Sequence, residues 1–245
     1  MTKIIGHRGG RNVWAENSRT GFEKTRDLAI DGVEFDVHLT GAGELLVIHD
    51  PTLDRTTMET GLVSALPRGA AQSVHLKGTS EGIPTLDDVL AIYAGTNVEL
   101  HIELKDDANG VPYPGIVEAV LAAVDRRGLR KQSFLTSFTT SLLADIRRAA
   151  PGVRTLSSLH APLVEREGLQ SALNTRLAVA DVIAIENAVL KAHWAEITDM
   201  VPLDRLGGWV PNSEDDLRYW LSLGLRQITT DEPVRALALH GKTDR

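Results

Sequence analysis

Short apolar runs, rich in β-branched residues, alternate along the chain with longer amphipathic segments. In the longer segments, apolar residues recur at the three- and four-residue spacing of a helix. Strands that alternate with helices predict a parallel sheet with right-handed crossovers. The predicted strands are 3–6, 33–37, 45–48, 98–104, 134–137, 155–159, 182–185, 206–210 and 227–230. The predicted helices are 85–94, 116–127, 141–149, 163–175 and 215–223, with Thr85 and Ser213 as N-caps.

The length of the chain favours closure of this sheet into a barrel. A barrel of eight βα units takes about 250 residues, and the chain has 245. Only a short stretch around Thr-Gly-Ala-Gly lies between Val37 and Leu45, and it is too short for a helical crossover. One of the predicted strands is therefore extra. We predict a single (β/α)8 TIM-type barrel domain over 1–245, with an open doubly wound sheet as the alternative.

One segment departs from the alternation of strands and helices. Residues 51–82 are poorly periodic and stand where a barrel would otherwise place a helix. We predict that they form an insertion over the mouth of the barrel, after the second strand region.

Carboxylates occupy one face of two predicted strands. Glu34 and Asp36 alternate with apolar residues in one strand, and Glu103 does so in another. An antiparallel sheet with one solvated face gives the same pattern. Both faces of a parallel barrel are covered, however, so inward carboxylates need a cation or a hydrogen-bond partner. Their oxygens suit Mg²⁺ or Ca²⁺ better than zinc. A metal site and a structural ion-pair cluster both stay open here.

Basic residues lie beside the predicted strand ends. His7-Arg8-Gly9-Gly10 follows the first strand, in a loop that lies on the catalytic face of a barrel. The Arg8 guanidinium could grip a phosphate in bidentate fashion, although a solvated turn is the alternative. Lys105 is two residues from Glu103 and could hold a phosphate oxygen. His49 ends a strand before Pro51 and could face His7 across the mouth of the barrel. It could transfer protons there, or it could have only a structural role.

Composition limits the partners. The formal charge is −7 and no basic run is present, which argues against binding to nucleic acid or an anionic membrane. A small anionic substrate stays possible. The chain has no cysteine, which excludes disulfides, thiolate catalysis and zinc–thiolate sites. No apolar run reaches the ~18 residues of a membrane span, and the opening residues lack the apolar core of a signal peptide. We therefore expect a cytoplasmic protein, of undetermined oligomeric state.

The order of the motifs resembles the glycerophosphodiester phosphodiesterase family, within the phospholipase C-like phosphodiesterase superfamily. The resemblance spans nearly the whole chain and depends on several motifs in order rather than on any single one. The matching segments are His7-Arg8-Gly9, Glu16-Asn17, Glu34-Phe35-Asp36-Val37, His49-Asp50 with Leu53 to Thr57, Pro84-Thr85-Leu86, Ile102-Glu103-Leu104-Lys105, Ser137-Phe138, Trp209 with Asn212, and Thr230-Asp231-Glu232-Pro233.

The resemblance implies a barrel with a small inserted subdomain after the second strand. It implies that Glu34, Asp36 and Glu103 coordinate one divalent cation, Mg²⁺ or Ca²⁺, with Mn²⁺ possible. It also implies metal-dependent hydrolysis of a small phosphodiester to a phosphomonoester and an alcohol.

The resemblance further implies roles for the basic residues. His7 and His49 would act as the general acid and base, while Arg8 and Lys105 would hold the phosphate of the substrate. The nucleophile is either water or the neighbouring hydroxyl of the glycerol, which would first give a cyclic phosphate.

Several departures from the family pattern bear on the substrate. Pro211 replaces a residue of the usual Trp-Thr-Val-Asn motif, and the loop 106–114 is long and rich in proline. Glu186 is a candidate pocket residue because it follows a predicted strand on the catalytic face. Trp209 is a candidate because it stands in the segment that resembles the pocket-lining motif of the family. A sugar phosphodiester of the opine type is an alternative substrate. A lyase that releases a cyclic phosphate is an alternative activity.

Overall fold

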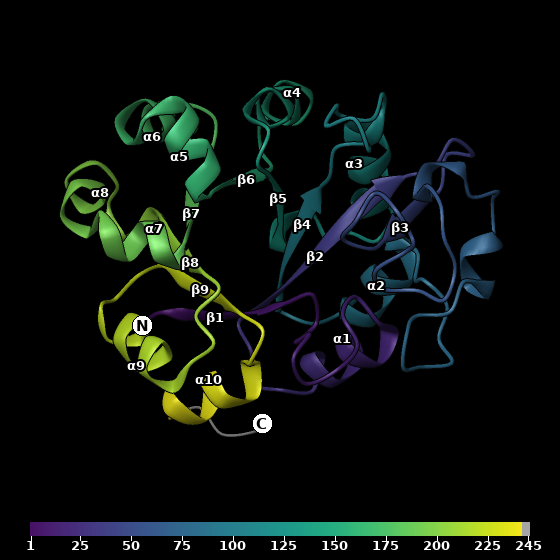
Figure 1. The fold of residues 1–245 in the computed structure, drawn as a ribbon, viewed down its shortest axis with the longest axis horizontal. Helices are drawn as coiled ribbons and strands as arrows, with labels where there is room; N and C mark the ends of the chain where they lie inside the picture. The colour runs from purple at the N-terminus through teal and green to yellow at the C-terminus, as the bar shows by residue number, and fades with distance from the viewer. Residues whose placement is uncertain (242–245) are drawn as a thin grey trace.

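The computed structural model describes residues 1–241 and contains one sheet of nine strands surrounded by helices (Figure 1). Eight strands are parallel, and β1 pairs with both β2 and β9, so they close into a barrel. This confirms the predicted (β/α)8 TIM-type barrel and excludes the open sheet. The strands are β1 (Lys3–His7), β2 (Gly32–Leu39), β3 (Leu45–Val47), β4 (Glu99–Leu104), β5 (Ser133–Ser137), β6 (Arg154–Leu159), β7 (Val182–Glu186), β8 (Leu206–Trp209) and β9 (Gln227–Thr230).

The extra strand is β3. It pairs antiparallel with the end of β2, with Val37 opposite Val47 and Leu39 opposite Leu45. A parallel partner would need a crossover, and the short connection allows only a hairpin-like return. Because β3 stands outside the barrel, β2 pairs directly with β4, which brings the two carboxylate-bearing strands together.

Helices surround the barrel in Figure 1 and cover its outer face. Four predicted helices are confirmed to within two residues at each end, namely α2 (Leu86–Tyr93), α3 (Ile116–Arg126), α4 (Thr140–Ala149) and α9 (Glu214–Ser222). Thr85 and Ser213 cap α2 and α9 as predicted, because their side chains accept from Asp88 N and Asp216 N. Short helices that were not predicted are α1 (Arg19–Arg26), α7 (Asn187–Ala192), α8 (Trp194–Met200) and α10 (Pro233–Leu239).

The prediction of one helix over 163–175 was wrong. The segment forms two helices, α5 (Ala161–Glu167) and α6 (Leu169–Leu177), which meet at Gly168. The backbone of Gly168 has φ of +74°, outside the helical region and accessible to glycine without strain. Helical spacing of apolar residues on both sides of the break concealed it in the sequence.

The alternation along β2 and β4 separates an apolar outer face from a polar inner face. Val33, Phe35 and Val37 of β2 are fully buried in the main core, between the sheet and the helices. The inward residues of β2 are in register with those of β4, so that Asp36 lies opposite Glu103. The sheet thereby places carboxylates of both strands toward the barrel interior, near the carboxyl ends of the strands.

Residues 51–82 contain two short 3-10 helices, at Val63–Ala65 and Ala70–Ser73, and a few isolated bridges between strand-like segments. In Figure 1 this segment lies beyond β3 and α2, at one edge of the molecule. It has its own apolar cluster, separate from the main core. The buried members are Leu46, Ile48, Leu53, Val63, Ala71, Val74, Leu76 and Ile83.

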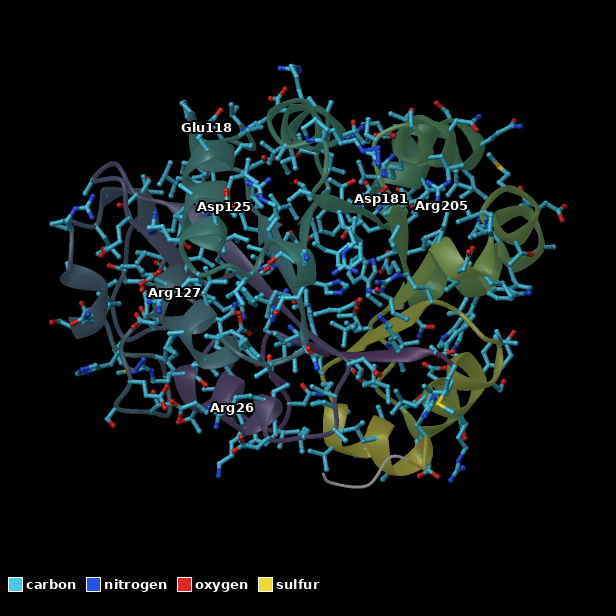
Figure 2. All side chains as sticks on the ribbon, turned by 180° about the vertical axis from the view of Figure 1, so that it is seen from behind. Arg26, Glu118, Asp125, Arg127, Asp181 and Arg205 are labelled. Atoms are coloured by element: carbon cyan, nitrogen blue, oxygen red, sulfur yellow. The ribbon has the colours of Figure 1, made fainter. Side chains whose placement is uncertain are left out.

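Charged side chains also cover the outside of the helices. Figure 2 shows Arg26 and Glu118 at the periphery of the molecule, on α1 and α3. Arg127, at the end of α3, forms an ion pair with Asp87 at its surface. Such exposed pairs contribute little to the free energy of folding, because water screens both charges. Within residues 1–241, no helix is both long and apolar enough to cross a membrane.

Candidate active site

Three carboxylates from β2 and β4 converge at the carboxyl end of the barrel. One oxygen from each of Glu34, Asp36 and Glu103 lies within 4.8 Å of the others. All three side chains are buried or nearly so, with exposures of 8%, 1% and 9%. Glu34 Oε1 is buried and has no hydrogen-bond partner among residues 1–241. An unpaired buried carboxylate oxygen beside two further carboxylates fits a hard divalent cation with oxygen ligands.

Two cations partly balance this negative charge. Lys105 Nζ lies 2.6 Å from Glu103 Oε1 and 3.3 Å from Asp36 Oδ1. Arg8 Nε lies 3.3 Å from Asp36 Oδ2. Burial acts to raise the pKa of Asp36, but Lys105 and Arg8 outweigh burial and hold that pKa well below its usual range. The pKa of Glu34 is raised, first by burial and then by Asp36 and Glu103. Glu34 is therefore the carboxylate whose charge the protein alone leaves least compensated.

The first loop has a strained backbone where it approaches the carboxylates. Arg8 and Asn17 have positive φ, of 49° and 53°, a region that residues other than glycine rarely adopt. In this conformation Arg8 N donates to Glu34 Oε2 at 3.2 Å, and Asn17 Nδ2 donates to Asp36 Oδ2 at 2.9 Å. Such strain persists where surrounding contacts enforce it, and it is concentrated at functional sites.

His7 ends β1 and is paired with a carboxylate from the far end of the chain. His7 Nδ1 lies 2.5 Å from Asp231 Oδ1, immediately after β9. Asp231 also accepts from Arg11 Nε and Asn212 Nδ2, both at 2.7 Å. Burial lowers the pKa of His7, even though its contact with Asp231 acts to raise it. A neutral ring with its proton on Nδ1 leaves Nε2 free to accept a proton, 3.7 Å from Glu34 Oε2.

His49 follows β3 and is paired with its sequence neighbour. His49 Nδ1 lies 2.6 Å from Asp50 Oδ1. The guanidinium of Arg55 donates to both oxygens of Asp50, at 2.6 and 3.0 Å, and to both oxygens of Glu16, each at 2.8 Å. Burial acts to raise the pKa of Asp50, but Arg55 and His49 outweigh it and lower that pKa to about 2. Asp50 therefore stays ionised beside His49 at neutral pH.

One pocket joins these groups and continues into the barrel. Its walls combine the polar residues above with an apolar side formed by Phe138, Leu156, Ala184 and Trp209. The rings of Phe138 and Trp209 meet edge to face, with centroids 5.6 Å apart. The residues that line the pocket are His7, Arg8, Glu34, His49, His101, Glu103, Lys105, Thr136, Phe138, Leu156, Ser158, Ala184, Trp209, Gln227 and Thr229.

Most of the site residues predicted from the sequence meet at this pocket, with one difference. Asp36 completes the carboxylate cluster through its contacts with Arg8 and Lys105. Trp209 is in the pocket wall. Glu186 is not among the lining residues, because its carboxylate turns to accept from Ala161 N at 2.8 Å, at the start of α5.

Several residues of the site were given no role in the sequence analysis and stood only within matching motifs. Asp231 and Asp50 pair with the two histidines, and Glu16 contacts Arg8. Arg55 donates to both Asp50 and Glu16. The position of Asp231 at the end of the last predicted strand was a usable signal. In a closed barrel, the first and last strands are neighbours, which brings their carboxyl ends together.

The chain is similar in sequence to known phosphodiesterases over most of its length. A model of the glycerophosphoryl diester phosphodiesterase family matches residues 7–235. A glycerophosphodiester phosphodiesterase of Bacillus altitudinis is 31% identical over 251 residues, covering 98% of each chain. Another, from Caldanaerobacter subterraneus subsp. tengcongensis, is 27% identical over 244 residues, covering 97% of each chain.

Solved structures give the same result for the fold. A crystal structure from Agrobacterium tumefaciens, of a protein assigned as a glycerophosphoryl diester phosphodiesterase, has a TM-score of 0.90 and 26% identity, covering 99% of this chain and 98% of that one. A phosphodiesterase of Oleispira antarctica, solved in complex with the product sn-glycerol-3-phosphate, has a TM-score of 0.74 and 21% identity, covering 98% and 96%.

Proposed function

The chain belongs to the glycerophosphoryl diester phosphodiesterase family of phosphoric diester hydrolases, and we propose that it cleaves its substrate with one divalent cation and the acid–base pair His7 and His49. The observation that carries this proposal is a cluster of three carboxylates, two of which line one pocket together with two histidines and two cationic side chains. Hydrolysis of a glycerophosphodiester is the activity of the family. The cation and the roles of the residues are the proposed part.

Glu34, Asp36 and Glu103 would hold the cation, since their oxygens converge and Glu34 Oε1 lacks another partner among the described residues. A bound divalent cation supplies a Lewis acid that stabilises charge on a non-bridging phosphate oxygen. Arg8 and Lys105 add positive charge at the same place and orient the phosphate through charge-assisted hydrogen bonds. Burial of these groups strengthens their attraction for an anionic substrate.

His7 and His49 would move the protons. Each ring contacts a carboxylate through Nδ1, which fixes its orientation and leaves Nε2 for the substrate. One ring takes the proton of the nucleophile, and the other donates a proton to the leaving alkoxide. A phosphodiester with a nitrophenolate leaving group separates the two roles, because that group leaves without protonation. The histidine whose loss is tolerated with this substrate is the general acid.

The decisive experiment assays metal-stripped protein with Mg²⁺, Ca²⁺ or Mn²⁺ restored. The substrates are glycerophosphocholine, glycerophosphoethanolamine, glycerophosphoglycerol and an opine-type sugar phosphodiester. We expect stripped protein to be inactive and one cation to restore release of sn-glycerol-3-phosphate. Full activity after stripping would refute the metal-dependent mechanism.

Phosphorus NMR of the products tests the route of the reaction. A cyclic phosphate that appears and then disappears indicates attack by the neighbouring hydroxyl, whereas direct formation of the monoester indicates attack by water. A cyclic phosphate that accumulates as the final product would make the protein a lyase. Activity towards the sugar phosphodiester alone would identify that compound, and not a glycerophosphodiester, as the substrate.

A further inference from the structure

A third histidine lies within the hydrogen-bond network of the site without reaching the pocket. His38 is on β2, two residues after Asp36, and its side chain is fully buried. His38 Nε2 lies 3.0 Å from the backbone oxygen of His49, and His38 Nδ1 lies 2.9 Å from the hydroxyl of Tyr113. Both polar atoms of this buried ring are therefore paired, and one of the partners is the main chain of a proposed catalytic residue.

The chemistry of the two partners fixes the direction of these hydrogen bonds. A carbonyl oxygen only accepts, so His38 Nε2 carries the proton and donates it to His49. In the neutral ring, Nδ1 is then the acceptor, and the hydroxyl of Tyr113 donates to it. The His49 carbonyl thus fixes the tautomer of His38, and the hydroxyl of Tyr113, by donating to Nδ1, stabilises that tautomer and the orientation of the ring.

Tyr113 belongs to the proline-rich loop that follows β4. Pro112 and Pro114 flank it, and the loop is closed by an isolated bridge between Asp106 and Pro112. The ring of Tyr113 also packs edge to face against His38, with centroids 5.7 Å apart and planes at 85°. The prolines restrict the backbone on both sides of Tyr113, so the hydroxyl is presented from a stiff support.

We propose that His38 and Tyr113 are positioning residues that fix His49 for proton transfer. The hydrogen bond from His38 holds the main chain of His49 on one side, while Asp50 holds the ring of His49 through Nδ1. Two independent restraints on one residue leave its ring little freedom to turn away from the substrate. The proposal rests on the proposed role of His49, and its test separates the two.

The test compares kcat and KM of three variants over a range of substrate concentrations, with the best glycerophosphodiester of the panel above. His38→Leu removes the donor to the His49 carbonyl, and we expect kcat to fall roughly 10- to 100-fold, as for a displaced catalytic group. KM should stay near the wild-type value, because Arg8 and Lys105 still hold the phosphate. His38→Gln can keep an N–H donor and should restore most of the rate. Tyr113→Phe removes only the hydroxyl and should lower kcat about fivefold.

A matched control and a second background make the result specific. Tyr93→Phe removes another buried tyrosine hydroxyl, which donates to Phe22 O at 2.9 Å on the outer side of the barrel, and should leave kcat unchanged. In a His49→Ala background, His38→Leu and Tyr113→Phe should have no further effect, because the group they position is gone. If His38→Leu does not fold, Tyr113→Phe provides the test by itself.

The outcomes are distinguishable. Equal losses of rate in the wild-type and His49→Ala backgrounds would overturn the positioning role, as would a rise in KM with kcat unchanged. A slow His49→Ala variant beside fully active His38→Leu and Tyr113→Phe variants would overturn this inference and leave the proposed function intact. Wild-type turnover by His49→Ala itself would overturn the acid–base assignment and this inference with it.

Discussion

The two histidine–carboxylate pairs, for which we propose matching roles, are supported by different parts of the structure. His7 and Asp231 are 224 residues apart and meet only because β1 pairs with β9, and Asp231 is fully buried. His49 and Asp50 are sequence neighbours whose side chains are 30% and 22% exposed. The pairing of the barrel strands supports the first pair, whereas Arg55, together with His38 and Tyr113, supports the second. We therefore expect damage to the first pair to affect both stability and rate, and damage to the second mainly rate.

Removal of each ring should have the largest effect. His7→Ala and His49→Ala should each lower kcat by about 10²–10⁴, the usual contribution of a general acid or base. The double variant should lose less than the product of the two factors if the rings act as one unit. Steady-state kinetics on the three proteins measures this. Wild-type turnover by either single variant would show that the two pairs do not have matching catalytic roles.

Replacement of Asp231 or Asp50 should distinguish the two histidine–carboxylate pairs by their effects on stability. Asp231→Asn should lower kcat roughly 100-fold, because the amide no longer selects the tautomer with a proton on Nδ1 of His7. It should also lower the free energy of unfolding by about 1–3 kcal/mol, since Arg11 and Asn212 donate to different oxygens of Asp231 and the amide keeps only one of them.

Asp50→Asn should lower kcat about tenfold and lower the free energy of unfolding by at most about 1 kcal/mol, because its surroundings are partly solvated. Chemical denaturation beside the kinetics gives both quantities for each variant. Equal stability losses in the two variants would contradict the difference in support.

Arg55 should have a smaller effect. Its side chain is 45% exposed, so Arg55→Ala should cost at most about 1 kcal/mol of positioning, or roughly a fivefold loss of kcat. High salt should reduce the difference in kcat between Arg55→Ala and wild type, because the contacts of Arg55 are ionic. Arg68→Ala is the matched control, since Arg68 belongs to the same inserted segment but donates to the backbone oxygens of Ala42 and Gly43, away from the site. A similar loss in both variants would point to general loosening of the segment.

The pH dependence of stability should show the smallest difference. The folded-state pKa of Asp50 is lowered to about 2, because Arg55 and His49 outweigh burial. The stabilisation is complete above the unfolded-state pKa of about 4 and disappears as the pH falls toward 2. After allowance for solvent screening, we expect about 1 kcal/mol. Denaturation of wild type and Asp50→Asn at pH 5, 4, 3 and 2.5 should show the two curves converging, and parallel curves would contradict the ion pair.

The parts of the site that were predictable from the sequence depend on local periodicity. The two-residue repeat of a strand placed Glu34 and Asp36 on the inner face, and the same repeat placed Glu103 there. Direct pairing of β2 with β4 then brought the three together. The role of Asp231 was not predictable from periodicity, since it depends on closure of the whole ring of strands. The turn of Glu186 toward Ala161 depends on the exact start of a helix, which periodicity does not define.

The contact between β1 and β9 also determines when the protein can work. Asp231 leaves the ribosome long after His7, so a nascent chain has every proposed metal ligand and both imidazoles while one imidazole still lacks its carboxylate. Catalytic competence should therefore arise late, with docking of the final strand. The onset of turnover during refolding would then report ring closure more directly than the recovery of helical signal.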